Sequence, residues 1–419
     1  MVKKFRLDNG ITVLLEPVEG VVSISAGLWV KTGSRDEKKE QYGYAHFVEH
    51  MLFKGTTTSS AADIARIVDR VGGQHNAATN REYTCYYINV ISEHIGMAVE
   101  LLADMYYNSV FDSVELGKEK NVIIEEIRMY EDTPDEFIHD LFMECMMEGH
   151  PLSHSILGTI ESMEATTRDS LVSFYDKQYG SENVIFVISG NFDINAAEML
   201  LARCFEKPRI YSGGIIMPGA VPARVLRKHV PRELEQVHFC MGTEGISRSD
   251  DDRWAMYLFS TILGGSMSSR LFQNIREKEG ISYSIYSFHS SYRDHGVFGI
   301  YCATSPETYR RAIDLIMREC RDLVEKGISE EELSDAKTFM KGNLALSLES
   351  TEVRMGQLAK NEIIFGRSFC FEDILQYINN ISLDDFQKIS QKLFRDKILS
   401  LVSVGEIEEP DVAGEDLRL

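Results

Sequence analysis

Cysteine is scarce in this sequence and shows no pairing pattern. The 419 residues contain seven cysteines, an odd number, and no two of them form a Cys-x-x-Cys pair. Disulfide frameworks need an even set of cysteines, and structural zinc sites usually take their thiolates from such pairs. The sequence therefore argues against both and favours a reducing compartment.

Long apolar runs are absent as well. The sequence has no run of about 18 consecutive apolar residues, the length that a membrane-spanning helix requires. Lys3 and Lys4 near the start are not followed by the apolar stretch of a secretory signal. We therefore expect a cytoplasmic protein without a membrane partner.

Basic residues are in deficit. The chain has 44 Lys and Arg against 65 Asp and Glu, a formal net charge of −21. This balance argues against nucleic acid as a partner, because binding to phosphates depends on basic side chains. It would attract cationic peptides, although an acidic surface equally serves solubility.

The chain is too long for one ordinary core, so we expect more than one domain. Similar residues recur at a nearly constant offset along it. The matching pairs are Asp169 with Asp384 and Gly190 with Gly405, each 215 apart, and Leu116 and Lys120 with Leu333 and Lys337, 217 apart. A constant offset predicts a duplicated domain of about 200 residues.

A linker is predicted between the two copies. Residues 208–231 hold four prolines and three glycines, a composition typical of linkers. The predicted boundaries are therefore a first domain over 1–207, a linker over 208–231 and a second domain over 232–419.

The segment 43–53 is predicted to form a helix with two different faces. Tyr44, Phe47, Val48, Met51 and Leu52 recur at the spacing of a buried helical stripe. His46, Glu49 and His50 fall on the neighbouring face. Side chains four apart lie side by side, so both imidazoles can reach one metal ion. Two neutral imidazoles suit zinc, and a carboxylate beside a zinc-bound water can take its proton.

This motif alone leaves the metal short of a ligand. A chance match to His-x-x-Glu-His in a chain with eleven histidines has a probability of roughly a few per cent. The predicted helix over 114–131 offers five glutamates: Glu115, Glu119, Glu125, Glu126 and Glu131. Glu119 and Glu126 are two turns apart and share a face. Spacing alone does not choose between Glu125 and Glu126 as the third ligand.

The motif and its surroundings resemble the pitrilysin family of zinc peptidases, which carries the inverted His-x-x-Glu-His sequence. The resemblance is to the processing-peptidase branch, which includes the β subunit of the mitochondrial processing peptidase and its bacterial homologues. It rests on His46, Glu49 and His50, on Ile123-Ile124-Glu125-Glu126-Ile127 with Asp132-x-Pro134, on Gly72-Gly73-x-x-Asn76-Ala77-x-Thr79, and on Tyr179 through Gly190-Asn191. It covers essentially the whole chain.

The resemblance implies an α+β fold of two duplicated domains, each an antiparallel sheet flanked by helices. It implies one Zn²⁺ per chain, held by His46, His50 and Glu126. Glu49 would be the general base, and Glu119 would orient a ligand.

The resemblance also implies residues that bind substrate. Asn76 and Ala77 would lie on an edge strand that pairs with the peptide backbone. In the second domain, Arg276 and Tyr283 match the family's Arg/Tyr element, which would hold substrate carbonyls. Arg276 could equally be a helical residue paired with Glu277. His75 matches no family role and is expected to be an ordinary surface or core histidine.

The implied activity is zinc-dependent hydrolysis of peptide bonds in extended, unfolded peptides or precursor segments inside a closed chamber. Because the metal motif and the Arg/Tyr element occur on one chain, a homodimer is expected. The alternative is a catalytically silent scaffold subunit of the same superfamily. Retention of the four residues His46, Glu49, His50 and Glu126 argues against it.

Overall fold

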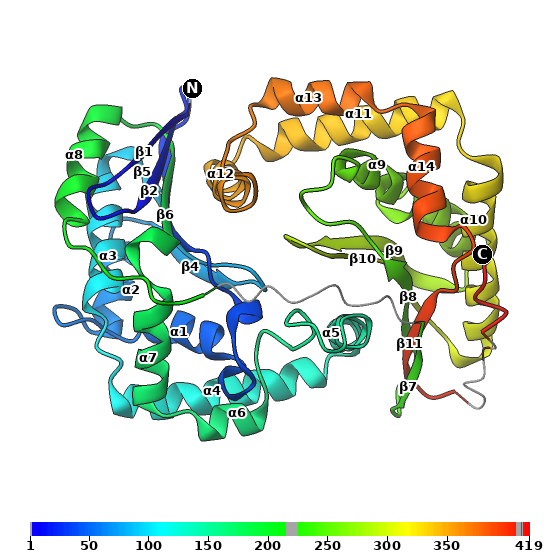
Figure 1. The fold of residues 1–419 in the computed structure, drawn as a ribbon, viewed down its shortest axis with the longest axis horizontal. Coiled ribbons are helices and arrows are strands. Elements are labelled where there is room, and N and C mark those ends of the chain that lie inside the picture. The colour runs from blue at the N-terminus through cyan, green and yellow to red at the C-terminus, as the bar shows by residue number, and fades with distance from the viewer. Residues whose placement is uncertain (1, 215–224, 408–411, 413) are drawn as a thin grey trace. The chain divides into compact units, whose positions relative to one another are not determined.

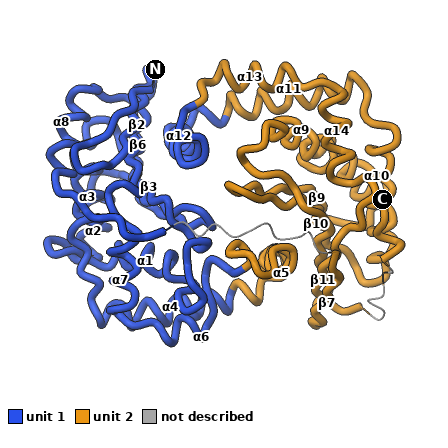
Figure 2. The backbone as a smooth tube through the Cα atoms, in the orientation of Figure 1, with its two compact units in different colours: residues 1–129, 154–219, 347–368 blue, residues 130–153, 220–346, 369–419 orange. Residues whose placement is uncertain are grey.

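The computed structural model describes residues 2–214, 225–407, 412 and 414–419. Residues 215–224 of the predicted linker, with Pro218, Gly219 and Pro222, lie outside the described residues. By packing, the chain divides into two compact units (Figure 2). The first unit comprises residues 1–129, 154–219 and 347–368, and the second comprises 130–153, 220–346 and 369–419.

Within the described part of the first unit, six strands form one sheet (Figure 1). They are β1 (Lys3–Arg6), β2 (Thr12–Pro17), β3 (Ser23–Val30), β4 (Gln74–Thr79), β5 (Thr84–Ile91) and β6 (Val184–Gly190), in the order β1-β2-β6-β3-β5-β4. A hairpin at Asn9-Gly10 joins β1 to β2, and Gly10 supplies the positive φ of 97° that the turn requires. Neighbours are antiparallel except β2 and β6, so the sheet is mixed rather than purely antiparallel. Strand β4 lies at an edge.

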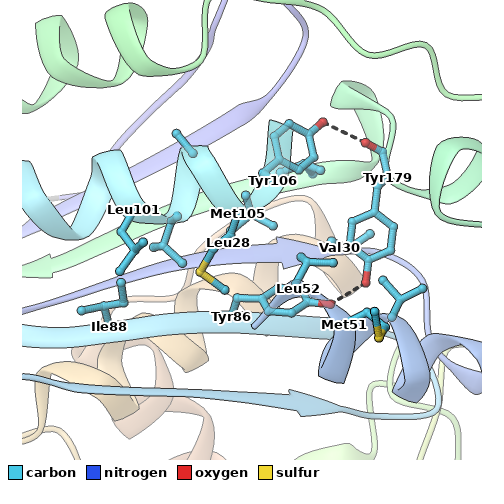
Figure 3. Close-up of a cluster of buried hydrophobic side chains, with 14 of the residues drawn as sticks. Leu28, Val30, Met51, Leu52, Tyr86, Ile88, Leu101, Met105, Tyr106 and Tyr179 are labelled. Carbon is cyan, nitrogen blue, oxygen red and sulfur yellow. Dashed lines mark hydrogen bonds between the residues drawn. The ribbon is translucent and has the colours of Figure 1, made fainter. Parts of the chain in front are cut away.

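Helices of the first half of the chain, apart from the one at 134–146, cover one face of this sheet. They are α1 (Tyr44–Leu52), α2 (Ala61–Asp69), α3 (Ile95–Asn108), α4 (Ser113–Glu131), α6 (Ile160–Ala165), α7 (Arg168–Gln178) and α8 (Ile194–Cys204). Their apolar side chains form the main core of the unit with alternate strand residues such as Leu28 and Ile88. Figure 3 shows how buried tyrosines are satisfied in this core: the hydroxyls of Tyr86 and Tyr179 lie 2.7 Å apart, and Tyr106 donates to the Tyr179 carbonyl.

The opposite face of the same sheet is covered by α12 (Thr351–Phe365), which comes from the second half of the chain. Met355, Leu358 and Ala359 of this helix pack on the strand residues that point away from the main core, among them Trp29 and Val187. This sheet face is apolar, and α12 removes it from water.

The second unit has the same plan. Strands β7 (Arg227–Pro231), β8 (Val237–Glu244), β9 (Ser282–Ser291), β10 (Gly296–Thr304) and β11 (Ser400–Gly405) form a sheet in the order β7-β11-β8-β10-β9. Here β7 and β11 are the parallel pair. The helices that the second half of the chain contributes to this unit are α9 (Arg253–Gly264), α10 (Tyr309–Lys326), α11 (Glu330–Ser347), α13 (Phe371–Asn380) and α14 (Leu383–Phe394).

A helix from the first half of the chain covers one face of this second sheet. Helix α5 (Pro134–Met146) packs Phe142 and Met143 against one set of strand residues, which includes Val402 and Val404. Alternate residues of the same strands, such as Phe239 and Phe298, face the core formed with α9, α10 and α14.

Each half of the chain therefore contributes one helix to the unit formed mainly by the other half: α5 belongs to the second unit and α12 to the first. Two similar units agree with the predicted duplication, but the packing units do not follow the sequence boundaries 1–207 and 232–419 throughout, and those boundaries stay a prediction. The amphipathic pattern of α5 and α12 shows that each helix buries one face; it carries no information about which sheet is covered. In the part of the chain that the structure describes, no helix combines the length and the apolar character needed to cross a membrane.

Candidate metal centre

The metal-motif helix α1 is held at its first turn by a buried carboxylate. Glu37 accepts backbone hydrogen bonds from Gly43 at 2.8 Å and from Ala45 at 2.7 Å, two of the donors that a helix start leaves unpaired. Gly43 adopts a φ of 89°, and a side chain there would meet the Leu157 carbonyl. The predicted apolar stripe of α1 is buried in the core, which leaves His46, Glu49 and His50 on the other face.

Helix α4 supplies the third ligand candidate. It packs with Leu116, Ile123 and Ile127 inward, which directs Glu126 toward both histidines. Nε2 of His46 lies 3.8 Å from Oε1 of Glu126, and Nε2 of His50 lies 3.7 Å from Oε2. Glu125, the open alternative of the sequence, is 70% exposed and pairs with Arg128 instead. Packing decides between the two neighbours.

These three side chains suit a zinc ion. Their ligand atoms all lie within 4.8 Å of one another, and no other group of this kind occurs among the described residues. Donors that share a tetrahedral zinc ion at about 2.1 Å lie about 3.4 Å apart, close to the spacing seen here. Burial, and then the neighbouring His50, lower the pKa of His46 to about 3, so its imidazole is neutral and able to bind metal.

Glu119 takes the position expected of a supporting carboxylate. Its side chain is buried, and its Oε2 lies 3.0 Å from Nδ1 of His50. An ionised carboxylate only accepts hydrogen bonds, so Nδ1 is the protonated nitrogen and Nε2 is left with its lone pair toward Glu126. This contact fixes the tautomer that a metal ligand needs.

Glu49 lies beside the histidines but outside the group that could hold the ion. Its Oε2 accepts a hydrogen bond of 2.5 Å from Oγ1 of Thr79, the last residue of β4. Burial raises the pKa of Glu49, and the hydrogen bond from Thr79 opposes that rise. A half-buried carboxylate that is not a ligand is a stronger proton acceptor than a fully exposed one.

The other predicted residues of the first unit lie on β4. This strand forms an edge of the sheet, as expected for Asn76 and Ala77. Asn76 is exposed, and its Oδ1 accepts a hydrogen bond of 2.9 Å from the Ala77 N–H. That these residues pair with substrate stays a prediction. The ring of His75 lies 5.5 Å from that of Phe53.

Arg276 and Tyr283 meet within the second unit. The Arg276 guanidinium carbon lies 4.6 Å from the centroid of the Tyr283 ring, and Tyr283 is 78% exposed. The alternative ion pair with Glu277 is long, at 3.9 Å. The helical turn that carries Arg276, residues Phe272–Lys278, is a π-helix rather than an ordinary α-helix. A substrate role for the pair is still a prediction.

Sequence reasoning gave no role to three residues that support the site: Glu37, which holds the start of α1, Lys54, which pairs with Glu119, and Thr79, which donates to Glu49. Lys54 stands four residues after His50, a helical neighbour spacing that could have drawn attention to it. Thr79 follows Ala77 by two residues and so shares its strand face. Nothing in the sequence pattern marks Glu37 as the residue that caps α1.

Comparisons with known proteins find matches that cover nearly the whole chain. Residues 12–160 match the family model described as insulinase (peptidase family M16), and residues 165–340 match the one described as peptidase M16 inactive domain. An uncharacterized zinc protease of Bacillus subtilis, YmxG, is 40% identical over 407 residues, which cover 96% of this chain and 98% of that protein.

The chain belongs to peptidase family M16. The resemblance to the pitrilysin family is thereby confirmed, since M16 is that family of zinc peptidases. An uncharacterized zinc protease of Streptomyces coelicolor is 35% identical, over 93% of this chain and 86% of its own. The match of 165–340 to an inactive M16 domain agrees with the sequence of α9, which has no histidine.

Solved structures of other proteins share the fold. A protease from Helicobacter pylori superposes with a TM-score of 0.90 at 22% identity, covering 97% of this chain and 99% of that one. A peptidase M16 inactive domain from Pseudomonas fluorescens has the same TM-score and identity, with 99% and 98% covered. Both likenesses concern the fold, and they confirm the predicted α+β class with two duplicated domains.

Proposed function

We propose that this M16 chain is a zinc-dependent endopeptidase or oligopeptidase that hydrolyses peptide bonds in extended, unfolded peptides. The observation that carries the proposal is the convergence of His46, His50 and Glu126, with the half-buried carboxylate of Glu49 beside them. The names of the curated relatives, which call them zinc proteases, support it. One Zn²⁺ per chain is proposed.

The chemistry divides between the ion and the side chains. Bound zinc would supply the Lewis acidity that polarises a peptide carbonyl and activates a water molecule. Glu49 would accept the proton of the attacking water and return it to the nitrogen of the leaving amine. Glu119 would hold His50 in the required tautomer throughout.

An exposed strand edge offers a way to bind such substrates. An extended peptide can add to β4 as a further strand, with backbone hydrogen bonds that do not depend on its sequence. Asn76 and Ala77 are the proposed contacts. Arg276, with its guanidinium group over the Tyr283 ring, is proposed to bind substrate carbonyls. We also propose that the working form is a homodimer that encloses the peptide, and that cationic peptides are favoured.

Four variants test the proposal, with zinc content and cleavage of an internally quenched, unstructured peptide library as readouts. Glu49→Gln should abolish cleavage but keep zinc near one equivalent, whereas His50→Ala should lose both. Glu126→Gln should weaken zinc binding strongly. Glu125→Gln is its matched control, because Glu125 is exposed on the same helix, and it should behave like wild type.

Two outcomes would count against the proposal. Zinc loss in Glu49→Gln equal to that in His50→Ala would make Glu49 a ligand rather than a base. A zinc-loaded wild-type protein that cleaves no peptide in the library would instead support the scaffold alternative.

A further inference from the structure

Thr79 stands at the contact between the metal-motif helix and the edge strand. Its hydroxyl donates to Oε2 of Glu49 over 2.5 Å, and this contact joins residues 30 apart in the sequence. The hydroxyl of a threonine on a strand has few rotamers, because its β-carbon is branched. Thr79 is therefore a stiff donor aimed at the proposed general base.

A second contact joins the same two elements. Burial along β4 alternates, with His75, Ala77 and Thr79 on the half-buried face and Gln74, Asn76 and Ala78 exposed. The half-buried face lies against α1 and its C-cap residue: the ring of His75 is 5.5 Å from that of Phe53, the C-cap, and the Thr79 hydroxyl donates to Glu49. Helix and strand are thus joined at two points, four residues apart on each, so Glu49 is held relative to the whole length of β4.

Glu49 needs such a hold. A glutamate has three rotatable side-chain bonds, so its carboxylate can take several positions unless a partner fixes it. The Thr79 hydroxyl stabilises the conformation in which the Glu49 carboxylate stays beside His50.

We infer that Thr79 is a positioning residue, which fixes the Glu49 carboxylate and makes β4 a common support for the substrate backbone and the general base. The inference rests on the proposed function for its catalytic meaning. The strand that pairs with the peptide would then also carry Thr79, the hydrogen-bond donor to Glu49. The position of the peptide along β4 would therefore fix its position relative to the general base. Displacement of a catalytic group by about 1 Å can lower a rate about a hundredfold.

Thr79→Val removes the hydroxyl and keeps the shape of the side chain. It should lower kcat by about tenfold to a hundredfold, while KM stays within about twofold and zinc content is unchanged. Thr79→Ser, which restores the donor, should recover most of kcat. The matched control is Thr84→Val: Thr84 is the cross-strand partner of Thr79, but its hydroxyl donates to the Thr32 carbonyl. This control should keep kcat near wild type.

Crystal structures of zinc-loaded wild type, Thr79→Val and Thr79→Ser provide a readout that does not depend on turnover. Glu49 should keep one conformation in wild type and Thr79→Ser and leave it in Thr79→Val. An unmoved Glu49 in Thr79→Val, or a serine variant as slow as the valine variant, would overturn the inference. If wild type binds zinc but cleaves nothing, the proposed function fails, and the Glu49 conformation still decides the role of Thr79.

Discussion

Lys54 and Glu119 form an ion pair, with 2.6 Å between Nζ of the lysine and Oε1 of the carboxylate. The second oxygen of Glu119 contacts Nδ1 of His50, so the carboxylate has one partner on each oxygen. Because Glu119 is buried, its charge needs such compensation. The series Lys54–Glu119–His50 connects the end of α1 to α4 and back to the metal site.

The ion pair should contribute to zinc affinity. Lys54→Met is expected to raise the Kd for zinc about tenfold, because Glu119 then holds His50 less firmly. Competition against a fluorescent zinc chelator would measure this. Lys118→Met is the matched control: Lys118 is an exposed residue of α4 paired with Glu115, and its loss should leave the Kd unchanged. Equal Kd values for the two variants would remove Lys54 from the account of the site.

The buried cap of α1 should be important for stability. Glu37→Gln keeps one acceptor oxygen but directs an amide N–H2 at a backbone donor of the helix. We expect the free energy of unfolding to fall by about 1–3 kcal/mol. Urea denaturation followed by circular dichroism would measure it. Glu40→Gln is the control, because Glu40 is exposed and close in sequence. It should lower the free energy of unfolding by less than about 0.5 kcal/mol.

The exchanged helix α12 should be as important to the first unit as a core element. Leu358 is 5% exposed and packs against the outer sheet face, so Leu358→Ala should destabilise the protein by about 2–4 kcal/mol. Val353→Ala on the same helix is the control, since Val353 is 43% exposed. Similar small losses for both variants would mean that α12 is only loosely attached to this face.

Stability should depend on pH through His289. Burial, and then the positive charge of Arg248, lower the pKa of His289 to about 4. The unfolded chain takes up the proton near pH 6.5, before the folded one does. The contribution of neutral His289 to the free energy of unfolding is therefore fully present above pH 6.5. It is lost as pH falls toward 4, by up to about 3 kcal/mol.

His289→Phe tests this dependence, because it keeps an aromatic ring beside Tyr257. Urea unfolding of wild type and variant is measured from pH 7 to pH 4 in the presence of a chelator that removes metal. The free energy of unfolding should fall less steeply with decreasing pH in the variant than in wild type. An equal pH dependence of the unfolding free energy in both proteins would show that the pKa of His289 is not lowered in the folded protein.

The proposed homodimer predicts rescue between inactive variants. Glu49→Gln and Arg276→Ala should each be nearly inactive as pure homodimers. If a site combines Glu49 of one chain with Arg276 of the other, random exchange makes about half the dimers mixed, each with one intact site. Activity should then recover to about a quarter of wild type, if sites are independent. Mass spectrometry would verify mixing; mixed dimers without recovery would exclude sites shared between chains.

The sequence alone determined the local chemistry. The His46 and His50 spacing placed both imidazoles on one helix face, because helical neighbours follow from the 3.6-residue period. Asn9-Gly10 specified its hairpin for an equally local reason. The 215-residue offset predicted two similar units, and the motifs carried the assignment to M16.

Tertiary structure decided what local pattern leaves open. Glu125 and Glu126 are adjacent on one helix, and only the packing of Ile123 and Ile127 turned Glu126 toward the histidines. An amphipathic pattern shows that α12 buries a face, yet the apolar sheet face available to it determined where it packs. The contact from Thr79 to Glu49 likewise depends on how a strand meets a helix. Such contacts join distant parts of the chain, and periodicity reports only on neighbours along it.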